Sequence, residues 1–183
     1  AIDFDPKMIN KIEETLSRIL RCFKPGRKFK LLPPDDGKFV DFFPSKAMEK
    51  RAVVLKYKPN RVLLVLETLV VALVNPLGTG STYYDDLCKK RNRGEVSSDL
   101  NYEEFRTLHF YSPTVFDSFG PHFTLLDPCS DLLEDAKNRS DIGKFFAEQF
   151  EGSLHEINID SICLLVQKES NTLWEIHREF AIH

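Results

Sequence analysis

The chain has 183 residues, which is enough for one domain with a sizeable core, and its hydrophobic content of 42% is ordinary for a globular protein. A formal net charge of -3 argues against broad electrostatic capture of nucleic acid, although it leaves room for a small basic cleft. The 4 cysteines are widely spaced without a C-x-x-C pair, so we expect free thiols rather than a zinc site. Unpaired cysteines and the lack of an opening secretory signal favour the cytoplasm.

The first part of the chain is predicted to form one helix followed by short strands. Residues 6–23 carry apolar side chains at helical spacing, with Asp5 as the N-cap. Residues 28–32 and 38–43 are extended runs on either side of a Pro-Pro-Asp-Asp-Gly turn signal, which predicts a hairpin. A third strand is expected over residues 51–56.

The middle of the chain is predicted to be helical. A long helix is expected from Pro59 to about residue 73. The apolar run over residues 62–77 is too short for a membrane span and contains Glu67, which favours a buried helix. Shorter helices are expected over residues 83–91 and 100–110, the second capped within the segment Ser97–Asp99.

The last part is predicted to run strand, helix, strand, strand. The expected elements are a strand over residues 122–126, a helix over 140–150 and an antiparallel pair over 157–168 and 173–182, joined by a turn at 169–171. The early part of the chain has a matching order if one further strand precedes Asp5.

We therefore predict an α+β fold with two β-α-β-β-like lobes and mainly antiparallel sheets around a central cleft. The chain is interpreted as a single domain over residues 1–183. The first lobe is placed at about 1–58 and the second at about 113–183. The helical connection between them is expected over about 59–112, with its helices at about 59–110.

The most informative motif is His122-x-Thr124, within the stretch GPHFTLL. Alternation along a strand puts His122 and Thr124 on one face, and it turns Phe123 and Leu125 towards a core. A titratable imidazole beside a hydroxyl is suited to a site that handles phosphate. The competing interpretation is the polar face of an ordinary strand.

Other polar residues have simpler structural interpretations. The basic run Lys89–Arg93 could hold a phosphate, but a solvated helix end is favoured. His177 falls on the polar face of the last strand, and His109 lies near a helix C-terminus, where the helix dipole favours histidine. We expect no metal and no cofactor, because no phosphate loop, nucleophile elbow or H-E-x-x-H motif occurs.

At Pro121–Leu125 the chain resembles the second motif of the two-histidine, LigT-like phosphoesterases. In layout the likeness covers most of the chain, including the connecting segment 114–119, the long helix 59–74 and the closing hairpin 159–182. The resemblance implies metal-independent cleavage of a phosphodiester, often a 2′,3′-cyclic phosphate or a ligated RNA end. Two histidines then act as general base and general acid, and hydroxyls bind the phosphoryl oxygens. Carried over to this chain, His122 is one acid–base group and Thr124 binds phosphate.

The chain departs from this family because it has no second H-x-T or H-x-S motif. In the family the first motif lies on the strand before the first helix, and here that strand would precede Ala1. One explanation is a phosphodiesterase, acting on a cyclic nucleotide or an RNA end, whose first motif lies upstream. The other is a catalytically inactive module that binds a nucleotide or a protein partner through the same cleft. Neither explanation involves a membrane.

Overall fold

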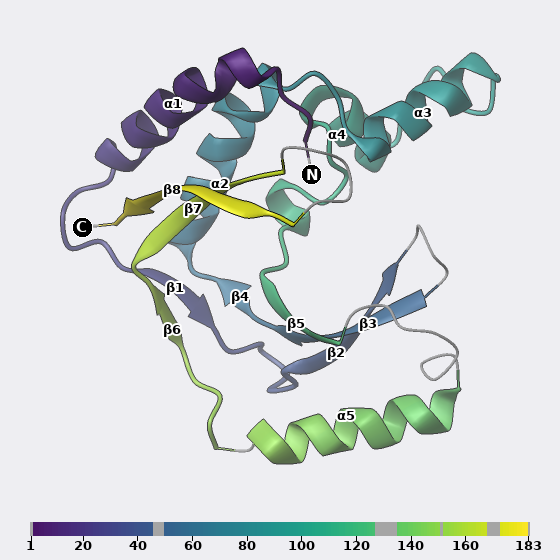
Figure 1. Cartoon of the computed structure of the whole chain (residues 1–183). Coiled ribbons are helices and arrows are strands. Elements are labelled where there is room, and N and C mark those ends of the chain that lie inside the picture. Colours follow the sequence, from purple (N-terminus) through teal and green to yellow (C-terminus); the bar gives the residue numbers. More distant parts are fainter. Residues whose placement is uncertain (1, 46–49, 127–134, 151, 168–172, 183) are drawn as a thin grey trace. The chain divides into compact units, whose positions relative to one another are not determined.

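A computed structural model describes residues 2–45, 50–126, 135–150, 152–167 and 173–182 (Figure 1). Helices and short strands are mixed, and the strand pairs whose register is known are antiparallel, which confirms the α+β class. The chain divides into two compact units. Unit 1 comprises residues 1–29, 61–119 and 159–183, and unit 2 comprises residues 30–60 and 120–158. Each unit combines segments that are distant in sequence, so its boundaries differ from those of the predicted lobes.

Unit 1 contains helices and one hairpin. Its elements are η1 (Pro6–Met8), α1 (Ile9–Arg21), α2 (Arg61–Leu73), η2 (Asn75–Leu77), α3 (Thr82–Asn92), α4 (Tyr102–Phe110), η3 (Phe116–Ser118), β7 (Ser161–Val166) and β8 (Glu175–Ala181). Unit 2 contains most of the strands and one helix. Its elements are β1 (Phe29–Leu32), β2 (Val40–Ser45), β3 (Lys50–Lys56), β4 (Lys58–Pro59), β5 (His122–Leu126), α5 (Ala136–Phe150) and β6 (Ile157–Ile159). The first residue of β1, Phe29, and the last residue of β6, Ile159, belong to unit 1.

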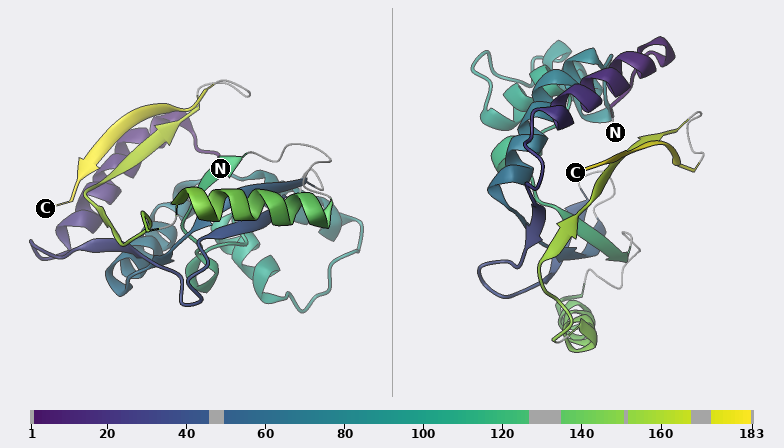
Figure 2. Two further views of the ribbon diagram at one scale, coloured as in Figure 1. Left: turned by 90° about the horizontal axis from the view of Figure 1, so that it is seen from below. Right: turned by 90° about the vertical axis from the view of Figure 1, so that its left-hand side faces the viewer.

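The first helical segment confirms the prediction. The Asp5 carboxylate accepts a hydrogen bond from the Lys7 amide at 2.9 Å and caps η1, which continues into α1. Ile12, Leu16 and Ile19 recur at helical spacing and are buried, as an amphipathic helix requires. This face allows α1 to pack against α2 (Figure 2).

The long apolar helix α2 begins later than predicted. Pro59 belongs to β4, where it pairs with Leu31, so the helix starts at Arg61. Leu63 and Leu66 are buried on one side of α2, as expected for a helix within a protein core. Among the described residues, no helix has both the length and the apolar character needed to cross a membrane.

Helix α4 starts after, rather than at, the predicted cap. The Asn101 side chain accepts from the Glu104 amide at 2.9 Å, and the Glu104 carboxylate accepts from the Asn101 amide at 2.9 Å. This reciprocal capping box satisfies two amides that have no partner within the helix. It fixes the start of α4 at Tyr102 instead of near Ser97–Asp99. Helix α5, in contrast, starts earlier than predicted, at Ala136.

The closing pair of strands is antiparallel, as predicted, with Ser161 opposite Ala181. The predicted strand 157–168 is interrupted at Asp160, whose carbonyl accepts from the Ile182 amide at 2.7 Å, and this divides it into β6 and β7. The turn expected at 169–171 lies outside the described residues.

The predicted hairpin between the first two strands is wrong. Strand β2 pairs with β3, whereas β1 lies between β4 and β6 in a different sheet. Residues 33–39 separate β1 from β2, and this connection is longer than the roughly 2–5 residues of ordinary hairpin loops. Each strand therefore finds its partner elsewhere in the chain.

The sheet that carries the H-x-T motif has the order β2-β3-β5. Strands β3 and β5, which the sequence interpretation assigned to different lobes, are antiparallel neighbours within unit 2. Val53, Val54 and Leu55 on the central strand are buried in succession, so both faces of β3 are covered. Helix α5 lies beside β2 (Figure 1). Gly143 of this helix approaches the Phe42 ring.

Candidate functional site

The predicted site residues lie at the start of β5, an edge strand of its sheet. His122 is opposite Lys56 of β3, and Thr124 is opposite Val54. Both His122 and Thr124 are exposed. Strand alternation puts the two side chains on the same face, so the motif has the arrangement that the i, i+2 spacing predicts.

The His122 ring is held by its own chain. Nδ1 lies 2.8 Å from the carbonyl oxygen of Gly120. Because a carbonyl oxygen can only accept a hydrogen bond, Nδ1 carries the proton and donates it. The lone pair of the neutral ring is therefore on Nε2. This bond selects Nε2 as the nitrogen that can take up or release a proton.

The prediction for Phe123 is wrong. Its side chain is 46% exposed instead of lying in a core, and its ring meets Tyr57 edge-on with centroids 5.7 Å apart. An edge strand is paired on one side only, which leaves its apolar residues less covered. Leu125 is partly buried and lies next to the register shift between β3 and β5.

The pairing of the strands adds charged residues to the motif. Lys56 faces the same side of the sheet as His122, because directly opposed residues share a face. Its Nζ lies 3.2 Å from a carboxylate oxygen of Asp36 and 3.5 Å from one of Asp41. The Lys38 amide, and then Lys56, hold the pKa of Asp36 below its ordinary value. Sequence reasoning missed this trio because only the register of β3 reveals it.

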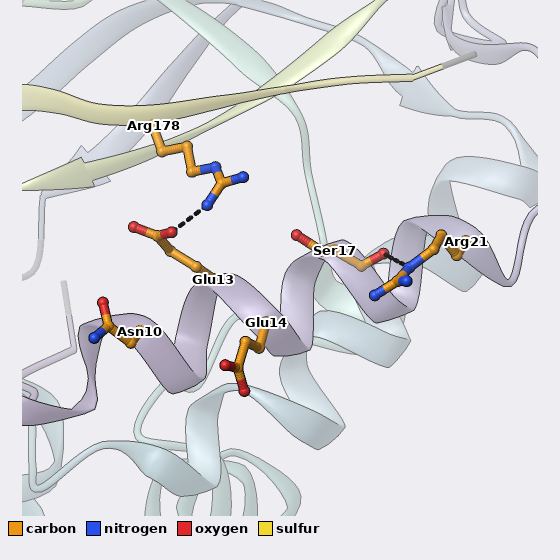
Figure 3. Close-up of a pocket in the computed structure, with 6 residues that line it drawn as sticks. All are labelled: Asn10, Glu13, Glu14, Ser17, Arg21 and Arg178. Atoms are coloured by element: carbon orange, nitrogen blue, oxygen red, sulfur yellow. Dashed lines mark hydrogen bonds and ion pairs between the residues drawn. The ribbon is translucent and has the colours of Figure 1, made fainter.

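His177 is exposed, as predicted, and it also contacts helix α1. Its Nε2 lies 2.7 Å from Oε1 of Glu13, and Arg178 donates to the other oxygen of the same carboxylate. Arg178, and then His177, lower the pKa of Glu13. Figure 3 shows Glu13 and Arg178 in the wall of a cavity of about 350 Å³ within unit 1; the lining residues are Asn10, Glu13, Glu14, Ser17, Arg21 and Arg178.

The remaining histidines occupy local positions. The ring of His109 lies 4.4 Å from that of Phe105 on the same helix. His155 repeats the geometry of His122, because its Nδ1 lies 2.9 Å from the Ser153 carbonyl oxygen, but it has no hydroxyl two residues further on. His155 is therefore a matched reference for the H-x-T motif.

The basic run is a charged helix end, as favoured by the sequence. Helix α3 ends at Asn92, and Lys89 lies 3.5 Å from Asp86 of the same helix. Arg93 pairs with Glu95 at 2.9 Å. Lys89 and Arg93 are thus paired with carboxylates that are close to them in sequence.

Cysteines and metal-binding groups add no further site in the described part of the chain. Cys22, Cys88 and Cys163 are free thiols, and Cys129 lies outside the described residues. No three His, Cys, Asp or Glu side chains gather there in a group that could hold a metal ion. Two cavities in the described part of the chain, of about 350 Å³ and 850 Å³, are not lined by His122 or Thr124, and both residues are exposed.

Comparison of the chain with protein-family models, with curated proteins and with solved structures gives no match. The resemblance to the two-histidine phosphoesterases therefore rests on Pro121–Leu125 and on layout, and it stays a prediction.

Proposed function

We propose that the protein is a metal-independent phosphodiesterase that acts on a cyclic nucleotide or on the phosphodiester of an RNA end. His122 is the acid–base group, and the Thr124 hydroxyl donates to a phosphoryl oxygen. The observation that carries the proposal is the hydrogen bond from His122 Nδ1 to the Gly120 carbonyl at 2.8 Å. It orients the ring and makes Nε2 the nitrogen that exchanges a proton in the proposed reaction.

The proposed reaction needs one proton transfer in each direction. A general base takes a proton from an attacking water as the water oxygen bonds to phosphorus. The bond from phosphorus to the ribose oxygen breaks, and that oxygen receives a proton. His122 performs one of these transfers, and a second group performs the other. Each role contributes about 10²–10⁴-fold to the rate.

The charges on this sheet face favour a diester over a monoester. Lys56 supplies one positive charge, whereas its partners Asp36 and Asp41 supply two negative charges. A phosphodiester carries one negative charge, but a monoester carries between about 1.5 and 2 near pH 7. The face therefore repels the monoester product more strongly than the diester substrate.

The test uses the full chain with 2′,3′-cyclic AMP and with an RNA bearing a 2′,3′-cyclic phosphate. We expect His122→Ala to lower kcat by about 10²–10⁴-fold. His155→Ala is the matched control, because it removes a histidine with the same carbonyl contact and should leave kcat unchanged. Thr124→Val should raise KM, and Thr124→Ser should restore it.

Two results would contradict the enzyme. The acid–base role is wrong if His122→Ala turns over as fast as the wild type. A wild type without turnover that binds a nucleotide, and loses binding in His122→Ala, supports the inactive binding module instead.

A further inference from the structure

A second cavity, of about 850 Å³, lies wholly within unit 1. Its volume falls in the range of small-molecule sites, which is about 300–1,000 Å³. Its wall is mainly apolar and comes from the segment before α1, from α1, from the loop after α4 and from the hairpin β7–β8. The apolar lining includes Phe4, Ile12, Val115, Leu164, Val166 and Trp174.

The charged lining is acidic. Asp3 and Asp5 contribute carboxylates, and among the lining residues in the described chain none is lysine or arginine. His177 also lines the cavity, but its Nε2 is 2.7 Å from the carboxylate of Glu13. A concave site whose fixed charges have one sign concentrates ligands of the opposite sign.

Hydrogen bonds order the chain segment that carries Asp3 and Asp5. The Asp3 amide donates to the Gly80 carbonyl at 2.8 Å, and the Thr79 amide donates to the Asp3 carbonyl at 2.7 Å. Asp5 is fixed because it caps η1 through its contact with the Lys7 amide. A chain segment that is already ordered loses little backbone entropy when a ligand binds to it.

Aromatic rings stand in the same wall. Tyr83, Tyr111 and Trp174 line the cavity, and Tyr83 and Trp174 are 49% and 50% exposed. Ring faces attract organic cations through the quadrupole of the π-system. Rings beside carboxylates suit a ligand that is both apolar and positively charged.

We propose that this cavity binds an organic cation with a compact apolar body and a protonated amine. The apolar body contacts the wall, and the ammonium group lies at Asp3 and Asp5. The site is independent of the phosphodiester chemistry proposed for His122, whose ligand is an anion.

The test uses three rigid probes with the same apolar body and different charge: 1-adamantylamine, 1-adamantanol and 1-adamantanecarboxylate. Trp174 is the only tryptophan of the chain and lines the cavity, so its fluorescence reports occupancy of the site. We expect the amine to bind about tenfold more tightly than the alcohol, and the carboxylate to bind most weakly.

Variants then locate the ammonium group. Asp3→Asn and Asp5→Asn remove one charge each and keep the shape, and asparagine also keeps the N-cap of η1. Each variant should lower the affinity for the amine by about tenfold and leave the affinity for the alcohol unchanged. Unchanged binding of the alcohol would also show that the cavity of the variant has folded. Glu148→Gln is the matched control, because it removes a carboxylate from α5 in unit 2.

Three outcomes overturn the proposal. The first is a Trp174 signal that does not respond to the amine at millimolar concentration. The second is equal affinity for all three probes, which would describe a cavity without charge selection. The third is an amine affinity that survives both aspartate variants.

Discussion

Unit 1 uses its buried polar side chains to hold irregular backbone, whereas unit 2 carries charged side chains on an open sheet face. In unit 1, Arg106, Ser81 and Asn75 are buried, and each donates to a backbone carbonyl in the stretch 110–115. Because this stretch includes irregular backbone, side chains supply hydrogen-bond donors to those carbonyls. Polar groups of this kind are expected to stabilise the fold.

In unit 2 the corresponding polar groups are partly or fully exposed. Lys56, Asp36, His122 and Thr124 all keep contact with solvent. Exposed ion pairs add little to stability because water screens them. The exposed ion pairs beside the H-x-T motif therefore add little stability, which agrees with the functional role proposed for this face. The comparison predicts stability losses in unit 1 and activity losses in unit 2.

The largest loss of stability is expected for Arg106→Met. Arg106 is 4% exposed, donates to the Val115 carbonyl at 3.0 Å and lies 4.4 Å from the centre of the Tyr102 ring. Removing it leaves that carbonyl without this donor and removes the stacking, at a cost of about 2–4 kcal/mol in the free energy of unfolding. Urea denaturation measures the change.

The control for Arg106 is Asp117→Asn. The Asp117 side chain is 67% exposed, although it lies 2.7 Å from Arg106. An exposed partner should matter far less than the buried arginine, so we expect a change below about 1 kcal/mol. Equal losses for the two variants would mean that the ion pair, rather than the contact with the backbone, supplies the stability.

The next largest effect is expected for Glu67→Ala. Oε1 of Glu67 accepts from the Phe116 amide at 3.0 Å, at a residue whose φ is +60°. Losing the acceptor should cost about 1–3 kcal/mol, because the amide would be left without this partner. Glu67→Gln keeps an acceptor oxygen and should keep most of the stability near pH 4.5.

Glu67 also predicts a pH dependence. Burial raises its pKa above the ordinary 4.5, and within the described residues Oε2 is buried without a hydrogen-bond partner. A raised pKa in the folded state means that the folded chain holds the proton more tightly than the unfolded chain does. This contribution is complete below pH 4.5 and is lost as pH rises through the folded pKa.

The wild type should therefore lose stability relative to Glu67→Gln as pH rises above 4.5. Unfolding both proteins in urea at a series of pH values measures the difference, from which the other titrating groups cancel. A difference that stays constant with pH, or one that grows in favour of the wild type, would show that burial does not penalise this carboxylate.

Local signals explain which parts of the fold were predictable. The Asp5 cap and the helical spacing of Ile12 and Ile19 are signals within one short segment of the chain. They were therefore sufficient to locate the first helix. Strand pairing is not local, because β1 pairs with β4 and β2 pairs with β3 although a turn signal separates β1 from β2. The hairpin prediction failed since a turn signal indicates a reversal of the chain but does not identify a partner.

The candidate site divides in the same way. The His122-x-Thr124 spacing is a local property, so alternation predicted their shared face. Lys56 joins them only through the register of β3 with β5, which depends on pairing between distant segments. The contact of His177 with Glu13 was not predicted for the same reason, because the two residues are 164 positions apart in the chain.

A smaller loss is expected for Ser81→Ala in unit 1. The Ser81 hydroxyl is fully buried, donates to the Tyr111 carbonyl at 2.6 Å and accepts from the Tyr84 amide at 3.1 Å as the N-cap of α3. Losing both bonds should cost about 1–2 kcal/mol. Ser81→Thr keeps the hydroxyl and tests whether the added methyl fits. A melting curve that Ser81→Ala leaves unchanged would contradict the role of buried polar groups in this unit.

The smallest change in stability is expected for Lys56→Gln in unit 2. Lys56 contacts only exposed carboxylates among the pairs described, so the free energy of unfolding should stay within about 0.5 kcal/mol of the wild type. Its effect should fall on KM for the cyclic phosphate, which should rise because the sheet face loses its cation, while kcat changes less. A stability loss as large as that of Arg106→Met would remove the contrast between the units. An unchanged KM would leave His122 and Thr124 as the phosphate-handling groups and would assign Lys56 to positioning Asp36 and Asp41.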